Sequence, residues 1–206
     1  MDQAVSRPYH HGDLRAALLG AAEAILERDG IQALTLRAAA RAAGVSHAAP
    51  AHHFGDLTGL LSELAAVGYR RFGAELLAAM EAAGDDPKLR MRAMGLAYVR
   101  FARTCPGMFM LMFRSECLDT ARPALREAND AAGQALLDAV VARAGGAAMA
   151  PAHIIAEAAA AWSLVHGFAV LLLDGRLEPM ISALPGSHDA EALLDAIFTV
   201  ESAGRS

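Results

Sequence analysis

The chain has 206 residues, of which 55% are hydrophobic and 20% charged, and its formal net charge is −5. These values exclude a disordered chain and leave room for one or two domains with a sizeable buried core. They also exclude a protein covered by positive potential, so a role in binding nucleic acid must depend on where a few basic groups lie.

The spacing of apolar residues predicts helices along the whole chain, because no segment alternates with the period of a β-strand between turn signals. Apolar residues from Leu14 to Ile25 recur at helical spacing. Asp29 and Gly30 end this first helix, since glycine accepts the left-handed conformation that follows a helix. Six later helices are expected at 56–83, 87–104, 107–118, 122–144, 151–173 and 189–201. With the first helix and two short helices between 35 and 54, the chain is expected to form about nine helices.

Residues 35–54 predict two short helices joined at Gly44. Thr35 and Ser46 are suitable N-caps for them, and Pro50 falls near the first turn of the second helix, where proline does least harm. Phe54 supplies a large apolar anchor at the far end. Two short helices with a glycine turn are typical of a helix-turn-helix, whose second helix lies in the major groove of DNA.

The segment from Ala158 to Leu173 is almost wholly apolar, but it is shorter than the roughly 20 residues that span a bilayer. Glu157 and Asp174 flank it, so the interpretation that we favour is a buried helix. The N-terminal segment lacks the apolar stretch of a secretory signal, and two cysteines do not make a disulfide framework. We therefore expect a cytoplasmic protein with no membrane partner.

The sequence "ALTLRAAARAAGVSHAAPAHHFGDLTGLLSEL" resembles the DNA-binding region of the tetracycline-repressor (TetR) family, and the match covers residues 10 to about 65. Its marks are a Leu-Thr-x-Arg start, an Ala-Gly-Val-Ser turn, a short recognition helix, and then a Phe and a Leu-Leu pair. Further on, "AAWSLVHGFAVLLLDG" is similar to the C-terminal core of a subgroup marked by Trp162, His166 and Gly167. The resemblance implies an all-helical homodimer that regulates transcription, in most members as a repressor released by a small ligand.

The resemblance also implies which residues touch DNA. Those on the recognition-helix positions are Ser46, His47, Ala48, Ala49, His52 and His53, and those at the start of the preceding helix are Thr35 and Arg37. Arginine can bond phosphate or guanine through two parallel hydrogen bonds, which makes Arg37 the strongest of these candidates. For His53 an alternative is that it packs with Phe54 and ends the helix.

Two residues depart from the family pattern, because Ala51 stands where a Tyr is usual and Leu57 where a Lys is usual. Both usual residues commonly contact phosphate, so their loss should weaken the sequence-independent part of binding. Groups that could compensate are Arg7, His10, His11 and Arg15. An ordinary helix entry, with Asp13 at the positive end of the helix dipole, explains that segment equally well.

The histidines could instead form a metal site or a catalytic group. His52 and His53 are neighbours and point about 100° apart on a helix, so they do not easily share one metal ion. No Cys/His spacing pattern accompanies them, and no nucleophile is placed beside a histidine base. We therefore predict no metal, no cofactor and no enzymatic activity.

The C-terminal region contains methionines and aromatic residues that suit either an adaptable ligand pocket or an ordinary core. The candidate ligand-binding residues are Met94, Tyr98, Phe101, Phe109, Phe113, Trp162 and His166. Trp162 and His166 share a helix face, and each carries a polar group that needs a partner when buried. That partner is either a ligand or a group of the protein itself.

Together these patterns predict an all-α chain with a helix-turn-helix DNA-binding domain at 1–60 and a ligand-binding and dimerisation domain at 61–206. The predicted function is sequence-specific binding of a double-stranded DNA operator by a homodimer, most often as a repressor, with a small apolar effector as a further partner. Two alternatives remain open at this point. One is a helical interaction module with weak or lost DNA binding, and the other is a small all-α enzyme that uses His166.

Overall fold

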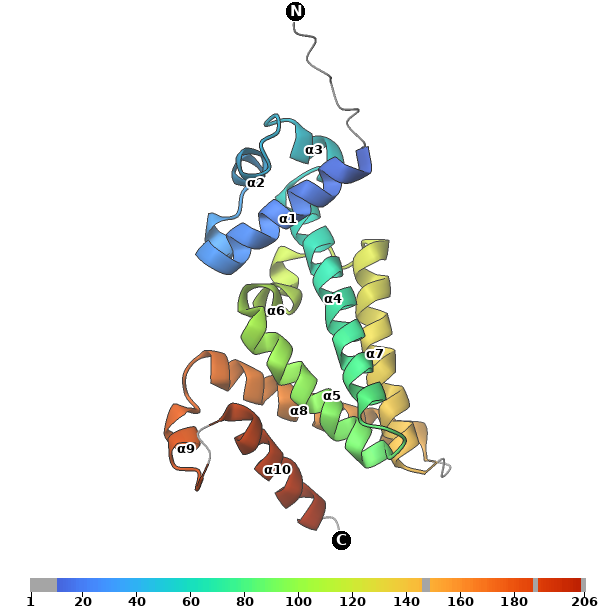
Figure 1. Cartoon of the computed structure of the whole chain (residues 1–206). Coiled ribbons are helices and arrows are strands. Elements are labelled where there is room, and N and C mark those ends of the chain that lie inside the picture. Colours follow the sequence, from blue (N-terminus) through green and yellow to red (C-terminus); the bar gives the residue numbers. More distant parts are fainter. Residues whose placement is uncertain (1–10, 146–148, 187–188, 205–206) are drawn as a thin grey trace, which may run out of the picture.

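The computed structural model describes residues 11–145, 149–186 and 189–204, and in these ranges the chain is helical, with no strand (Figure 1). The α-helices are α1 (His11–Asp29), α2 (Leu36–Ala42), α3 (Ala49–Phe54), α4 (Leu57–Ala82), α5 (Pro87–Thr104), α6 (Pro106–Met112), α7 (Pro123–Arg143), α8 (Pro151–Leu173), α9 (Glu178–Ser182) and α10 (Ala190–Gly204). Two 3-10 turns, η1 (Ile31–Ala33) and η2 (Ser115–Cys117), complete them. The predicted all-α class is confirmed.

Helices α1, α2 and α3 form an N-terminal unit at one end of the molecule, and α4 leads from it into a helical bundle of α4 to α10 (Figure 1). Leu18 of α1, Leu34 before α2 and Phe54 of α3 are buried together with Leu60 of α4, so the first turn of α4 shares the core of the N-terminal unit. Because α4 continues without a break from Leu57 to Ala82, it crosses the expected domain boundary between residues 60 and 61. That boundary stays a prediction.

Side-chain caps set the starts of two helices in the N-terminal unit. The hydroxyl of Thr35 accepts the backbone N–H of Ala38 at 3.0 Å and caps α2, as the sequence predicts. The carboxylate of Asp56 accepts the N–H of Gly59 at 2.7 Å and caps α4. Each cap satisfies a backbone donor that has no partner inside its helix.

The predicted N-cap of the third helix is wrong. Helix α3 begins at Ala49, and Ala48, which has no capping side chain, precedes it in place of Ser46. Proline explains the difference: a helix capped by Ser46 would place Pro50 where its missing N–H is needed and its ring clashes with the preceding turn. With Ala48 as N-cap, Pro50 lies in the first turn, where that N–H has no partner inside the helix.

Two other helix boundaries differ from the prediction. The helix expected at 107–118 ends at Met112 and is followed by η2, because the chain turns there and brings the N–H of Asp119 to the hydroxyl of Ser62. Helix α9 was not predicted, since Gly175 and Pro179 are typical helix breakers. In the structure Gly175 turns the chain at φ 71°, while Pro179 lies in the first turn of α9, where proline is tolerated.

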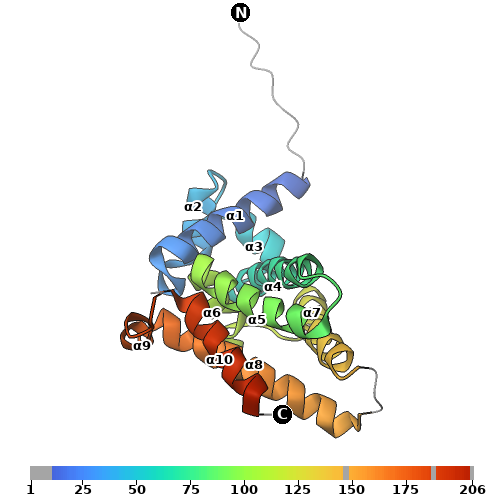
Figure 2. The same cartoon turned by 60° about the horizontal axis from the view of Figure 1, so that its bottom comes forward.

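Within the bundle, α4 packs against α5 and α7, α8 packs against α5 and α7, and α10 packs against α5. Arginines on α5 hold α10 in place: Arg92 pairs with Asp195, and Arg100 with Glu191 at 2.9 Å. Helices α8 and α10 lie at the end of the molecule opposite the N-terminal unit in Figure 1, and Figure 2 shows this end turned toward the viewer.

Helix α8 is largely exposed in the single chain, so the interpretation of its apolar segment as a buried helix is wrong for the isolated protomer. It is long and apolar enough to cross a membrane by length and composition alone, yet only 17% of its most apolar window is buried. Its buried residues are Ala158, Val165, Phe168 and Ala169, which lie against the bundle. The remaining apolar side chains need another explanation.

A carboxylate of α1 joins the N-terminal unit to the bundle. Glu27 accepts the backbone N–H groups of Gly107 at 2.9 Å and Met108 at 2.8 Å, at the start of α6. These donors belong to the first turn of α6 and have no partner within it, and a negative charge is favourable at that helix end. A Cβ atom on Gly107 would lie 2.8 Å from the carbonyl oxygen of Leu26, so only glycine permits this approach.

Candidate nucleic-acid interface and apolar cavity

The residues expected to touch DNA lie at the start of α2, in the turn before α3, and on α3 itself. Those that are exposed are Thr35, Arg37, Ser46, His47, Ala48 and His52, and those that are half-buried are Ala49 and His53. Ser46 and His47 precede α3 and do not lie within its first turn. The structure therefore presents this set at the outer surface of the N-terminal unit, and contact with DNA stays a prediction.

Arg37 and His47 are available to a ligand. Within the described residues, neither side chain makes a hydrogen bond or an ion pair, and both are exposed. The hydroxyl of Thr35 already accepts from Ala38, but its own hydrogen can still be donated to a phosphate oxygen. A cation free of intramolecular partners can exchange water for phosphate without breaking a contact of the fold.

The two adjacent histidines have different surroundings. The ring centroid of His53 lies 5.6 Å from that of His52 and 6.1 Å from that of Phe54. His53 is half-buried beside Phe54, as its packing interpretation requires, whereas His52 is exposed. Among the described residues no three of His, Cys, Asp and Glu gather where they could hold a metal ion.

Of the proposed compensating groups, only Arg15 has a described side chain. Arg7 and His10 lie outside the described residues, and so does the side chain of His11. Arg15 forms an ion pair with Glu63 of α4, and its guanidinium lies 5.7 Å from the ring centroid of Phe54. Arg15 is therefore engaged within the protein.

A cavity of about 1170 Å³ lies among α4, α5, α7, α8 and α10. Most of its lining is apolar and includes Tyr69, Phe72, Leu76, Met94, Val140, Val165 and Phe198. The charged residues on the lining are Lys88, Arg92, Asp130, Arg143 and Glu157. This volume is somewhat larger than the roughly 300–1,000 Å³ of typical small-molecule sites, which are likewise mostly apolar with a few polar groups.

The predicted ligand-binding residues divide between this cavity and the core. Those that line the cavity are Met94, Tyr98, Phe113 and Trp162. Phe101 and Phe109 do not, because both are fully buried in the core of the bundle. His166 is not on the lining either, but its Nδ1 atom lies 2.8 Å from the oxygen of Tyr98, which is.

Tyr98 links two of the subgroup residues through one hydroxyl. The indole N–H of Trp162 donates to the Tyr98 oxygen at 3.3 Å, so that hydroxyl can give its own hydrogen to Nδ1 of His166. Burial lowers the pKa of His166, which favours the neutral ring that this arrangement requires. Burial also raises the pKa of Tyr98, so its hydroxyl keeps its proton at neutral pH.

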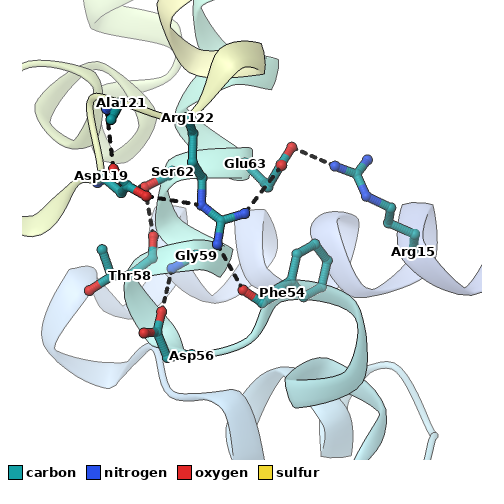
Figure 3. Close-up of polar contacts among 10 residues, drawn as sticks. All are labelled: Arg15, Phe54, Asp56, Thr58, Gly59, Ser62, Glu63, Asp119, Ala121 and Arg122. Atoms are coloured by element: carbon teal, nitrogen blue, oxygen red, sulfur yellow. Dashed lines mark hydrogen bonds and ion pairs between the residues drawn. The ribbon is translucent and has the colours of Figure 1, made fainter.

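Sequence reasoning missed a cluster of charged groups behind α3, which Figure 3 shows. The guanidinium of Arg122, at the start of α7, donates to the carbonyl oxygen of Phe54 at 3.1 Å and lies 3.6 Å from carboxylate oxygens of Glu63 and Asp119. Arg15 shares Glu63. We call these residues the Arg122 cluster. The sequence assigns Arg122 no such role, because no local pattern reveals a contact with a carbonyl 68 positions away.

Two family models match the chain. One, described as "Bacterial regulatory proteins, tetR family", matches residues 18–64, and the other, described as "Tetracyclin repressor-like, C-terminal domain", matches residues 91–199. The two matches fall on the N-terminal unit with the start of α4 and on α5 to α10. Among curated proteins, none matches the chain.

Several solved structures have the same fold. A protein of unknown function from Rhodococcus sp. RHA1 is 34% identical over 95% of this chain and 96% of its own, with a TM-score of 0.78. The TetR family transcriptional regulator PfmR from Thermus thermophilus is 21% identical over 89% and 95% of the two chains, with a TM-score of 0.61. A TetR family transcription regulator from Marinobacter aquaeolei VT8 is 17% identical over 91% and 95%, with a TM-score of 0.62. At these last two identities the likeness concerns the fold alone.

Proposed function

Because this chain belongs to the tetR family of bacterial regulatory proteins, we propose that it is a repressor that a small ligand releases from its operator. It is a DNA-binding transcriptional regulator and not an enzyme. The observation that carries the DNA contacts is the exposed pair Arg37 and His47, one on α2 and one in the turn before α3, neither held by another side chain among the described residues. Phosphate contacts position such a unit, and contacts to base edges give it specificity.

Selection of bound DNA from a random pool tests this function. We expect the full chain to enrich one two-fold symmetric sequence and to bind it more tightly than scrambled DNA of the same composition. Failure to enrich any sequence would favour the helical interaction module, the alternative that Ala51 and Leu57 suggest. Leu57 is half-buried against the core, so its side chain packs inward and does not replace the usual lysine.

We also propose that the protein is a homodimer built on α8 and α10. Large apolar side chains on these helices are exposed in the single chain, including Ile155 at 64% and Val200 at 72%. Exposed apolar area of this kind marks an interaction surface, and a second copy of the chain would cover it. Two recognition units related by a two-fold axis would read half-sites one helical turn, or a multiple of it, apart.

Substitution of Ile155 by Asp should make the protein monomeric. The change would place a charge in an apolar interface, where an unpaired carboxylate is costly. Sedimentation at micromolar concentration, without DNA, measures the outcome. Leu77→Asp, at a residue of α4 that is 53% exposed, is the matched control and should leave the dimer intact. A parent chain that sediments as a monomer under these conditions would contradict the proposed dimer.

The cavity supports an uncharged apolar effector. Its two lining arginines are paired with carboxylates, Arg92 with Asp195 and Arg143 with Glu157. The other charged residues of the lining are Lys88 and Asp130, and their opposite charges favour neither an anionic nor a cationic ligand. A charged group moved from water into an apolar cavity without a partner loses free energy of hydration. The favoured ligand is therefore hydrophobic and uncharged.

Fluorescence of Trp162 should report this ligand, because Trp162 is the only tryptophan and lines the cavity. Dodecanol, dodecanoate and dodecylammonium share one apolar chain and differ in charge. We expect dodecanol to change the emission at the lowest concentration. His166→Ala should weaken the response to the ligand without abolishing operator binding, because it frees the Tyr98 hydroxyl. If His166→Ala instead mainly lowers the melting temperature, His166 is a hydrogen-bonding residue of the core.

Three finer assignments belong to the same proposal. We assign the C-terminal domain to the subgroup marked by Trp162, His166 and Gly167, because the first two residues meet at Tyr98 beside the cavity. We place the division between the DNA-binding domain and the ligand-binding and dimerisation domain at residues 60 and 61. We also assign the protein to the cytoplasm, where its operator is, with α8 covered by the partner subunit and not by lipid.

A further inference from the structure

We propose that Arg122, a residue of the bundle, is a positioning residue for DNA recognition, because it fixes the orientation of α3 from behind. The proposal rests on the proposed function, in which α3 and the turn before it read DNA. Arg122 comes from the loop that leads into α7, and its guanidinium reaches the last residue of α3 (Figure 3). The Arg122 cluster thus connects three segments that are far apart in the sequence.

Helix α3 cannot hold its own orientation. It has only six residues, and an isolated helix of that length is not stable in water. Its last carbonyl groups lack partners within the helix, and a positive charge is favourable at that end. The guanidinium of Arg122 donates to one of these groups, the carbonyl oxygen of Phe54, at 3.1 Å. Gly55 caps the end of α3 by donating its N–H to the carbonyl oxygen of Ala51 at 2.9 Å, and Arg122 adds from the bundle a partner for the carbonyl of Phe54.

Phe54 is held at two points by the cluster. Its carbonyl oxygen accepts from Arg122, and the guanidinium of Arg15 lies 5.7 Å from its ring centroid. The two arginines share the carboxylate of Glu63 on α4, which is mostly buried. Both arginines that contact Phe54 are thus paired with one carboxylate of α4. The two contacts therefore fix the position of α3 relative to α4.

The loop that carries Arg122 is itself fixed on α4. The hydroxyl of Ser62, a fully buried residue, accepts the N–H of Asp119 at 2.8 Å and donates to the carbonyl oxygen of Thr58 at 2.7 Å. The Asp119 carboxylate then lies 3.6 Å from Nε of Arg122. The guanidinium is thus presented to α3 from a loop with a defined position.

The close contact between Arg122 and the end of α3 requires a glycine at position 59. A Cβ atom on Gly59 would lie 2.0 Å from the carbonyl oxygen of Phe54 and 2.5 Å from Nη2 of Arg122. Nε of Arg122 is buried and has no hydrogen-bond partner among the described residues. Half-buried charges with incomplete hydrogen bonding add little stability, and their better attested role is to specify one geometry. This combination favours positioning as the role of Arg122.

The test compares Arg122→Gln and Arg122→Lys with Arg126→Gln. Arg126 is exposed on the next turn of α7 and has no partner among the described residues, so it controls for the loss of one positive charge. Affinity is measured for the operator selected by the parent chain, for versions with half-sites one base pair closer or farther apart, and for scrambled DNA. Melting temperatures are recorded for all variants.

We expect Arg122→Gln to weaken operator binding by about tenfold or more and to reduce the preference for the natural half-site spacing. Affinity for scrambled DNA should stay that of the parent, because Arg122 does not touch DNA. Arg122→Lys should restore part of the affinity, since one ammonium group can reach the Phe54 carbonyl. Arg126→Gln should behave like the parent in every assay.

Two results would overturn the proposal. The first is an Arg122→Gln variant with the parent's affinity and spacing preference, whatever its melting temperature. The second is an equal loss of affinity for operator and scrambled DNA, which would mean that Arg122 contacts phosphate directly. A parent chain that selects no operator would overturn the proposed function and this inference together, whereas the first result leaves the proposed function standing.

Discussion

Replacement of Gly59 by alanine is expected to displace α3, lower the melting temperature by about 5 °C or more, and remove operator binding. The added Cβ atom would lie 2.0 Å from the carbonyl oxygen of Phe54, far inside van der Waals contact. That oxygen belongs to the backbone, so it cannot rotate away as a side chain does. Relief of the clash requires α3 to move away from α4, which also breaks the bond from Arg122.

Gly73→Ala is the matched control for this prediction. Gly73 lies in the same helix, α4, and a Cβ atom there would meet nothing within 4 Å. Alanine is the better helix former by roughly 0.5–1 kcal/mol, so this variant should melt at the same temperature as the parent or slightly higher. Thermal melting and an operator titration of both variants measure the outcome. Similar behaviour of the two variants would show that the steric argument at Gly59 is wrong.

Local chemistry explains which elements the sequence could predict. The limits of α8 at 151–173 and the cap of α2 at Thr35 agree with the structure, because proline, periodicity and capping act within one helical turn. The predicted start of α3 was wrong because a cap at Ser46 makes Pro50 the fourth helical residue, just past the positions whose N–H groups need no partner inside the helix. Helix α9 was missed because proline is unfavourable inside a helix but favourable in its first turn, where Pro179 lies.

The candidate site was predictable only where it depends on local pattern. Exposure of Arg37 and His47 follows from their polar side chains at the start of α2 and in the turn before α3, and the resemblance assigns them to DNA. The cavity does not follow in this way. Phe101 on α5 and Phe113 directly after α6 are the same residue type, yet Phe101 fills the core and Phe113 lines the cavity. Their difference is set by how α4, α5 and α8 pack, which helical spacing does not encode.

Side chains that contact phosphate and side chains that contact base edges should respond differently to substitution. Arg37→Ala tests a phosphate contact. Arg37 lies in the first turn of α2, exposed and unpaired among the described residues, where a charged group meets phosphate. Its removal should weaken binding to every sequence and lower the slope of log affinity against log salt by about one for each subunit contact. Arg70→Ala, at an exposed arginine of α4 far along the chain, controls for the change in net charge and should leave the slope unchanged.

His47→Ala tests a base contact, because His47 lies in the turn that leads into α3, where side chains can reach base edges. Its removal should cost roughly 1–3 kcal/mol for each base contact and relax the preference at one position of each half-site. Neither variant should melt earlier than the parent, since both side chains are exposed and make no contact that the fold needs. Titrations on operator and scrambled DNA at several salt concentrations separate the two effects. If both variants bind like the parent, DNA does not contact this face, and the recognition surface must lie elsewhere on the N-terminal unit.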